Sequence, residues 1–231
     1  MFDRRTFLKG STATVAAIST SRHANAAASP SAVGGYNYRL PEFRKGSRLL
    51  FQGDSITDMK WGRNEKDRNH YLGHSYVYLI AARLGVDMPE AGLDIYNRGV
   101  SGHKVADLRG RWQKDAIDMK PDLLSILIGV NDVGRNLNGV DVTQWEADYR
   151  FILDASRKAN PDLRLVLLDP FVLASGRLAN AEAFRQWRDQ VERLLPIVKQ
   201  LAADYHAVHI KMQEVFDAAA KAVSPEHWIW D

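Results

Sequence analysis

The sequence predicts an α/β fold in which a parallel five-stranded sheet lies between two layers of helices. Two observations predict it. Short apolar runs alternate with amphipathic stretches from residue 48 onward, and each interval is long enough for a helical crossover. The length of 231 residues suits one domain with a sizeable buried core. We therefore expect a three-layer α/β/α sandwich.

The expected elements follow in order along the chain. Five apolar runs predict strands at 48–52, 93–97, 123–128, 163–168 and 207–210. Helical spacing of apolar residues predicts helices at 71–84, 105–119, 142–159, 181–204 and 212–223. Pro121 and Pro161 end the second and third helices, and Pro196 is expected to kink the fourth. The run at 123–128 is continuously apolar, as expected for a strand covered on both faces.

Residues 1–26 have the pattern of a twin-arginine export signal. Arg4 and Arg5 precede a weakly apolar stretch at 10–20, which is followed by the small-residue cleavage site Ala24-Asn25-Ala26. A flexible basic tail is the alternative interpretation of this segment. Residues 27–44 are expected to form a flexible lead-in and residues 45–231 the folded domain. The predicted location is therefore periplasmic or secreted.

Charge and composition exclude several classes of protein. Residues 1–26 hold four of the 31 basic and one of the 28 acidic residues, which leaves 27 of each after cleavage. A neutral chain gives no electrostatic reason to expect nucleic acid binding. The sequence contains no run of 18 apolar residues, so no membrane span is predicted after signal removal. The absence of cysteine excludes disulfides, thiol catalysis and cysteine zinc sites.

Three short motifs follow the first three predicted strands. Ser55 lies in Gly-Asp-Ser-Ile-Thr, Gly99 in Asn-Arg-Gly-Val-Ser-Gly, and Asn131 in Gly-Val-Asn-Asp. The carboxyl ends of parallel strands share one edge of a sheet, so the motifs are expected to converge there. A serine can attack a carbonyl once a base takes its proton, and backbone N–H groups and amides can stabilise an oxyanion. Taken singly, each motif is also explained by a turn or a helix cap, and we interpret Asp54 and Asp132 as structural.

Together the motifs resemble those of the SGNH (GDSL-type) hydrolase superfamily, over roughly Arg48 to Asp231. The resemblance implies a flavodoxin-like sheet with Ser55 as the nucleophile. It also implies an oxyanion hole formed by the backbone N–H groups of Ser55 and Gly99 and the side chain of Asn131. Asp231 matches the aspartate of the family's Asp-x-x-His, which orients the catalytic histidine.

The resemblance also implies the reaction. A carboxylic ester would be hydrolysed through an acyl-serine intermediate, without a cofactor or a metal. The substrate would be a small-molecule or polysaccharide ester, with O-acetyl groups on carbohydrates as the favoured class. Loop 60–69, with Trp61, is the expected substrate contact. No oligomeric state is predicted.

The sequence departs from the family pattern at the histidine. The family's histidine would come three residues after Asp231, so we expect this domain to be truncated at its C-terminus and, as it stands, to lack the base. His103 and His227 are the alternatives considered for that role. If the chain truly ends at Asp231, the alternative function is a non-catalytic ligand-binding protein. His70 and His74 lie one helical turn apart but have no third ligand at a suitable spacing, so no metal site is expected.

Overall fold

The computed structural model describes residues 40–64, 66, 70–134 and 139–229. The chain divides into two units, Met1–Pro41 and Glu42–Asp231, and the fold described below is that of the second unit. The predicted export signal, most of the lead-in and Asp231 lie outside the described residues.

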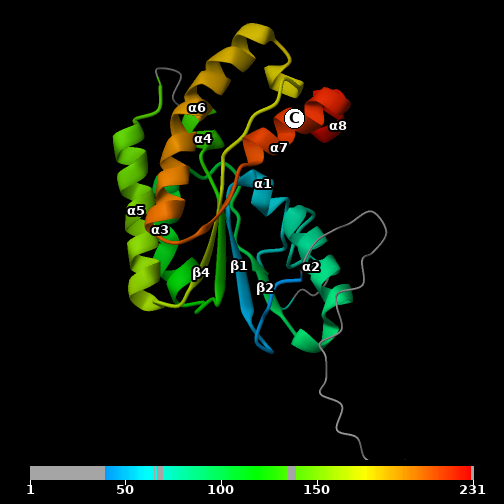
Figure 1. Cartoon of the computed structure of the whole chain (residues 1–231), viewed down its shortest axis with the longest axis vertical. Coiled ribbons are helices and arrows are strands. Elements are labelled where there is room, and N and C mark those ends of the chain that lie inside the picture. The colour runs from blue at the N-terminus through cyan, green and yellow to red at the C-terminus, as the bar shows by residue number, and fades with distance from the viewer. Residues whose placement is uncertain (1–39, 65, 67–69, 135–138, 230–231) are drawn as a thin grey trace, which may run out of the picture. The chain divides into compact units, whose positions relative to one another are not determined.

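Five parallel strands form one sheet (Figure 1). They are β1 (Arg48–Gly53), β2 (Asp94–Asn97), β3 (Leu123–Leu127), β4 (Arg164–Leu168) and β5 (Val208–Ile210). Their order is β2-β1-β3-β4-β5 and every neighbouring pair is parallel. This is the flavodoxin-like order, so the predicted sheet is confirmed. Because β1 lies between β2 and β3, the segments that follow these three strands leave the sheet side by side.

Helices cover both faces of the sheet (Figure 1). The longer ones are α2 (Tyr76–Asp87), α3 (Val105–Trp112), α5 (Val142–Ala159), α6 (Ala181–Asp204) and α7 (Met212–Ala222). The shorter helical segments are α1 (Ser55–Asp58), α4 (Val130–Gly134) and α8 (Pro225–Trp228), with a π-helical turn at Gln113–Ile117 and 3₁₀ turns at Pro89–Ala91 and Gly176–Leu178. Among the described helices, none is both long and apolar enough to cross a membrane.

The core is divided by the sheet, as alternating side chains require. On one face, α3, α5 and α6 bury their apolar sides against Leu50, Leu124, Ile126, Leu165 and Leu167. On the other face, α2 covers Leu49, Phe51 and Ile95. Met212 and Phe216 of α7 pack near Leu127 and Leu168. These layers confirm the predicted α/β/α sandwich.

Two predicted helices differ from the observed ones. The helix expected from residue 71 begins at Tyr76, because the Ser75 hydroxyl caps it by accepting a 3.2 Å hydrogen bond from the Val77 N–H. The helix expected at 105–119 changes at Gln113 into a π-helical turn. Within that turn the Asp115 carbonyl accepts a 2.6 Å hydrogen bond from the buried Gln52 side chain, a contact that the sequence pattern does not reveal.

Candidate active site

The three predicted motifs adjoin at one edge of the sheet. The Val100 N–H, in the segment after β2, donates a 3.0 Å hydrogen bond to the carbonyl of Gly53 at the end of β1. The Asn131 side-chain amide, in the segment after β3, donates a 3.1 Å hydrogen bond to the His103 carbonyl. The segment after β2 therefore joins the serine turn to the asparagine turn, as the strand order requires.

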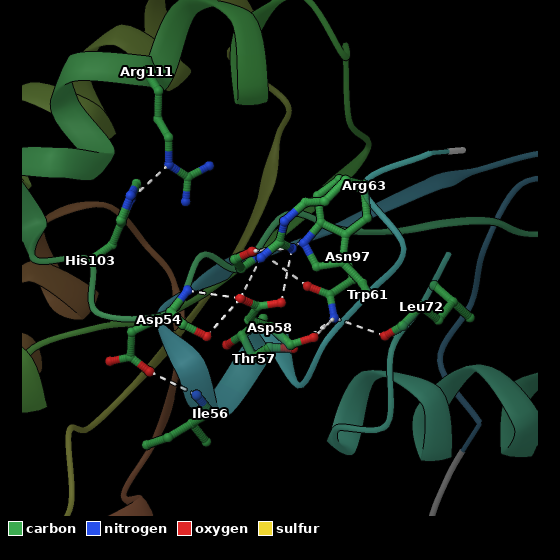
Figure 2. A network of polar contacts seen from close by, with 12 residues as sticks. Asp54, Ile56, Thr57, Asp58, Trp61, Arg63, Leu72, Asn97, His103 and Arg111 are labelled. Atoms are coloured by element: carbon green, nitrogen blue, oxygen red, sulfur yellow. Dashed lines mark hydrogen bonds and ion pairs between the residues drawn. The ribbon is translucent and has the colours of Figure 1, made fainter. Parts of the chain in front are cut away.

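Ser55 is exposed at the first position of α1. The preceding residue, Asp54, is the N-cap, and its Oδ1 accepts a 3.0 Å hydrogen bond from the Ile56 N–H (Figure 2). The turn from strand to helix thus presents the serine hydroxyl to solvent while the aspartate points inward. This arrangement suits a nucleophile, and it confirms that Asp54 ties the turn in place.

Burial raises the pKa of Asp54 to about 7, against its usual value of 3.8. The unfolded chain ionises this carboxyl near pH 4, so the stability that a protonated Asp54 contributes is complete below pH 4 and is lost as the pH rises toward 7. The difference between these two pKa values corresponds to roughly 4 kcal/mol in the free energy of unfolding. Burial raises the pKa of Asp132 to about 7 in the same way.

Asp54→Asn is expected to raise the free energy of unfolding at pH 8 and to weaken its dependence on pH between about 4 and 7. Asparagine keeps an acceptor for the Ile56 N–H but cannot ionise. Urea unfolding at several pH values measures the effect. Asp141→Asn, at the exposed N-cap of α5, is the matched control and should keep the wild-type pH dependence. An Asp54→Asn variant with wild-type pH dependence would contradict the assignment.

Gly99 does not present a free amide. Its N–H donates a 2.9 Å hydrogen bond to Asn97 Oδ1, and its carbonyl accepts 2.8 Å from Trp61 Nε1. A Cβ at this position would lie 2.4 Å from the Asp58 nitrogen, so glycine is needed for close packing against α1. The predicted oxyanion role of Gly99 is corrected for this reason: its amide is already engaged.

Gly102, three residues further on, is another candidate for the amide donor. Its φ of 81° is in the left-handed region, which favours glycine. Among the described residues, no acceptor for the Gly102 N–H is found. The next carbonyl, of His103, holds the Asn131 side chain at 3.1 Å, so Gly102 and Asn131 lie close together. The second glycine of Gly-Val-Ser-Gly is the signal that could have identified it.

The histidines considered as bases do not have the partners of a catalytic base. His103 Nδ1 accepts a 3.2 Å hydrogen bond from Arg111 Nε (Figure 2). Burial, and then the charge of Arg111, lower the pKa of His103. His227 lies on exposed α8 with its ring against Trp228. Neither ring is oriented by a carboxylate in the described part of the chain.

One histidine–carboxylate pair does occur at this edge. His209 Nε2, in β5, lies 2.7 Å from Asp169 Oδ1, just after β4. Three strand spacings separate β5 from β1 and two separate β4 from β1, so at about 4.8 Å per spacing His209 lies roughly 14 Å and Asp169 roughly 10 Å from the serine strand. We interpret the pair as a link between the ends of β4 and β5.

A surface hollow of about 390 Å³ lies outside this site. It is lined by residues such as Leu124, Ser156 and Asn160, near the amino ends of β3 and β4. The motifs follow the carboxyl ends, so the hollow is at the opposite end of the sheet. Within the described ranges, no three histidine, aspartate or glutamate side chains are grouped as a metal site would require.

The family is settled by comparison with known proteins. Residues 51–228 match the model of the GDSL-like Lipase/Acylhydrolase family. The chain belongs to this family. The match spans the serine, glycine and asparagine motifs, and it confirms the predicted carboxylic ester hydrolase of the GDSL type.

Several known proteins are similar to half of the chain or more. The acetylxylan esterase of Geobacillus stearothermophilus is 33% identical over 195 residues, which cover 80% of this chain and 85% of that protein. Its crystal structure superposes with a TM-score of 0.68, at 32% identity over 81% of this chain and 86% of the other. A protein from Parabacteroides merdae assigned as a GDSL-like lipase reaches a TM-score of 0.76 at 34% identity, over 82% and 88% of the two chains. The uncharacterized lipoprotein YqeF of Bacillus subtilis is 31% identical over 54% of this chain and 49% of its own length.

The motif search missed three polar residues beside the GDSL serine. Asp58, Arg63 and Asn97 form the network in Figure 2, which connects α1 with the segment after β2. Asn97 begins the glycine motif and Asp58 directly follows the serine motif, but neither was singled out. In the sequence, each could have been recognised as a polar residue at the last position of a buried strand or of a one-turn helix.

Proposed function

We propose that the protein is an exported serine esterase that removes acyl groups, O-acetyl groups in particular, from carbohydrates. The observation that carries the proposal is the exposed Ser55, at a strand end whose neighbouring segments supply amide donors. The acetylxylan esterase activity of the relative that is 33% identical supports the substrate class.

In the proposed reaction the Ser55 hydroxyl attacks the ester carbonyl and loses its proton to a base. The negative charge on the carbonyl oxygen is stabilised by the Ser55 N–H, the Gly102 N–H and one N–H of the Asn131 side chain. The alcohol leaves with a proton returned by the base, and an acyl group remains on Ser55. Water then attacks the acyl-serine in the same way and releases the acid.

The proposed base is a histidine oriented by Asp231, three positions beyond that aspartate. Support comes from the relative, since catalytic mutants of the acetylxylan esterase replace a serine, an aspartate and a histidine, the last two three positions apart. Asp231 itself lies outside the described residues. A histidine in this position would receive the Ser55 proton, and the aspartate would stabilise its charged form.

Export by the twin-arginine route is part of the proposal. It rests on Arg4, Arg5 and the small-residue site at 24–26. One of the relatives is a lipoprotein, which fits a protein that acts outside the cytoplasm. An acetylated polysaccharide is too large to enter the cell, so its deacetylase would need to be exported.

The substrate class is tested with a panel of esters on the full-length protein. We expect release of acetate from acetylated xylo-oligosaccharides and from 4-nitrophenyl acetate, and little hydrolysis of 4-nitrophenyl palmitate. A fluorophosphonate probe should label Ser55. Binding of the oligosaccharide without acetate release or labelling would contradict the esterase and favour a ligand-binding protein. A preference for the long acyl chain would contradict the carbohydrate substrate.

A further inference from the structure

The carboxylate of Asp58 accepts four hydrogen bonds although its side chain is only 2% exposed. Two come from Ser101, whose N–H and Oγ both lie 2.8 Å from Asp58 Oδ2. Two come from the Arg63 guanidinium, at 2.9 Å to Oδ1 and 2.6 Å to Oδ2. A buried charge is tolerated when it is paired and fully hydrogen-bonded, as it is here (Figure 2).

This carboxylate links two of the three proposed oxyanion donors, the N–H groups of Ser55 and Gly102. Asp58 is the last residue of α1, the four-residue helix that begins with Ser55. Ser101 immediately precedes Gly102. The path from the nucleophile to the proposed amide donor therefore runs through one turn of helix, one carboxylate and one residue of the segment after β2.

Asn97 provides a second link between α1 and the segment after β2, and this link reaches only as far as Gly99. Its Nδ2 donates to the carbonyls of Thr57 at 2.6 Å and Leu72 at 2.8 Å, and its Oδ1 accepts from the Gly99 N–H. These contacts fix the segment as far as Gly99, and the Val100 N–H is held by the Gly53 carbonyl at 3.0 Å. Ser101, which precedes the Gly102 amide, is held by Asp58.

Arg63 is the solvent-facing member of the network. Its side chain is 49% exposed, and its guanidinium carbon lies 4.7 Å from the centre of the Trp61 ring. Trp61 is itself anchored by its hydrogen bond to the Gly99 carbonyl. Stacking, the fork of two hydrogen bonds to Asp58 and a longer hydrogen bond of 3.4 Å to the Gly99 carbonyl hold Arg63 in one orientation over the carboxylate.

We propose that Arg63 is a positioning residue for ester hydrolysis, because its guanidinium fixes the Asp58 carboxylate that aligns the Ser101–Gly102 backbone with Ser55. This inference rests on the proposed function. Arg63 acts through Asp58 and Ser101 and does not touch the reacting atoms. A displacement of about 1 Å at reacting groups can lower a rate about 100-fold, so the alignment matters to turnover.

The network also predicts a pH effect. Burial raises the pKa of the Asp58 carboxyl, but the hydrogen bonds and charge of Arg63, with the Ser101 donors, outweigh it and hold the pKa below its usual value. Without Arg63, only the Ser101 donors oppose the effect of burial, so the pKa of Asp58 should rise and the carboxyl should take up a proton at higher pH. Once protonated, Asp58 binds the Ser101 donors more weakly, so turnover should fall on the acid side.

Arg98 is another charged group near this network, since its guanidinium carbon lies 5.1 Å from the centre of the Trp61 ring on which Arg63 also stacks. Arg63 approaches from the segment after α1, and the neutral Ser101 from the segment after β2. His103 and Arg111 pair with each other further on. The charge of Arg63 also helps to lower the pKa of His103, so removing Arg63 changes both groups and the experiment must separate them.

The test compares Arg63→Gln and Arg63→Lys with wild type on 4-nitrophenyl acetate, at temperatures well below the melting temperature of each. Arg63→Gln is expected to lower kcat about 10- to 100-fold, with KM within about threefold, and to slow fluorophosphonate labelling similarly. Arg63→Lys should recover part of kcat, since it restores the charge without the fork. Arg185→Gln, at an exposed pair with Glu182, is the control and should match wild type.

The pH dependence identifies the group responsible. Arg63→Gln should show an acid-side fall in kcat at higher pH than wild type. In Arg63→Gln/Asp58→Asn this extra fall should disappear, because asparagine does not ionise. Its persistence would point to His103 and overturn the inference.

Further results would overturn the positioning role of Arg63 or the proposed function. An unchanged kcat in Arg63→Gln, or a rise in KM alone, would overturn the positioning role, the latter in favour of direct substrate contact. A wild-type protein that neither hydrolyses the ester nor reacts with the probe would contradict the proposed function, and the inference with it. Active wild type with equally active Arg63→Gln contradicts the inference alone.

Discussion

Ser55→Ala is expected to abolish ester hydrolysis, with a loss in kcat on the order of 10⁶ if the proposed triad operates. The hydroxyl is the only protein group in the proposed reaction that forms a covalent bond to the acyl carbon. Ser55 is exposed at the start of α1, so alanine should leave the fold intact. Acetate release measures ester hydrolysis, fluorophosphonate labelling measures the reactivity of the serine, and the melting temperature measures whether the fold is intact.

The control for this change is Ser224→Ala. Ser224 is also an exposed serine at a helix start, and its side chain makes no capping hydrogen bond. It should keep wild-type activity. A Ser55→Ala variant that retains more than about a tenth of wild-type kcat would exclude an acyl-serine at this position, since loss of a nucleophile normally costs far more.

Asn131→Ala is expected to lower kcat by about 10²–10³, the usual cost of losing one oxyanion donor. One N–H of the Asn131 amide is occupied by the His103 carbonyl at 3.1 Å, which orients the side chain. The other N–H remains for the acyl oxygen, because a carboxamide carries two. The charge on that oxygen develops only in the transition state, so KM should change little.

Steady-state kinetics of Asn131→Asp complete this test. Aspartate has the same shape as asparagine but offers an acceptor where a donor is needed, and it should be at least as impaired as alanine. A full recovery of kcat in Asn131→Asp would show that shape, and not hydrogen-bond donation, is what the position supplies. A rise in KM without loss of kcat would instead assign Asn131 to ground-state binding.

Much of the fold could be predicted because local patterns determine it. The helices at 142–159 and 181–204 have the predicted ends, and the side chains of Asp141 and Asn180 cap them by accepting backbone hydrogen bonds. The strands were predicted to within one or two residues from apolar runs. The false helix start at residue 71 arose because residues 71–74 continue the apolar spacing of α2, while the Ser75 cap excludes them.

The site was less predictable because its contacts join residues far apart in the chain. Ser101 and Asp58 are 43 residues apart, and Asn97 and Thr57 are 40 apart. No periodicity reports such pairs. The choice between Gly99 and Gly102 has the same origin, since the sequence alone does not show that Asn97 occupies the Gly99 N–H. Ser55 and Asn131 stay predictions whose surroundings suit their proposed roles.

The strand order has a consequence for how the chain is made. β1 is synthesised first, yet its two neighbours in the sheet end at Asn97 and Leu127. Until the ribosome has released residue 127, the apolar side chains of Leu49, Leu50 and Phe51 have no complete sheet to enter. Parallel pairing over such sequence distances is slow and leaves apolar surface open to aggregation. The nascent first half of this domain should therefore be a chaperone client.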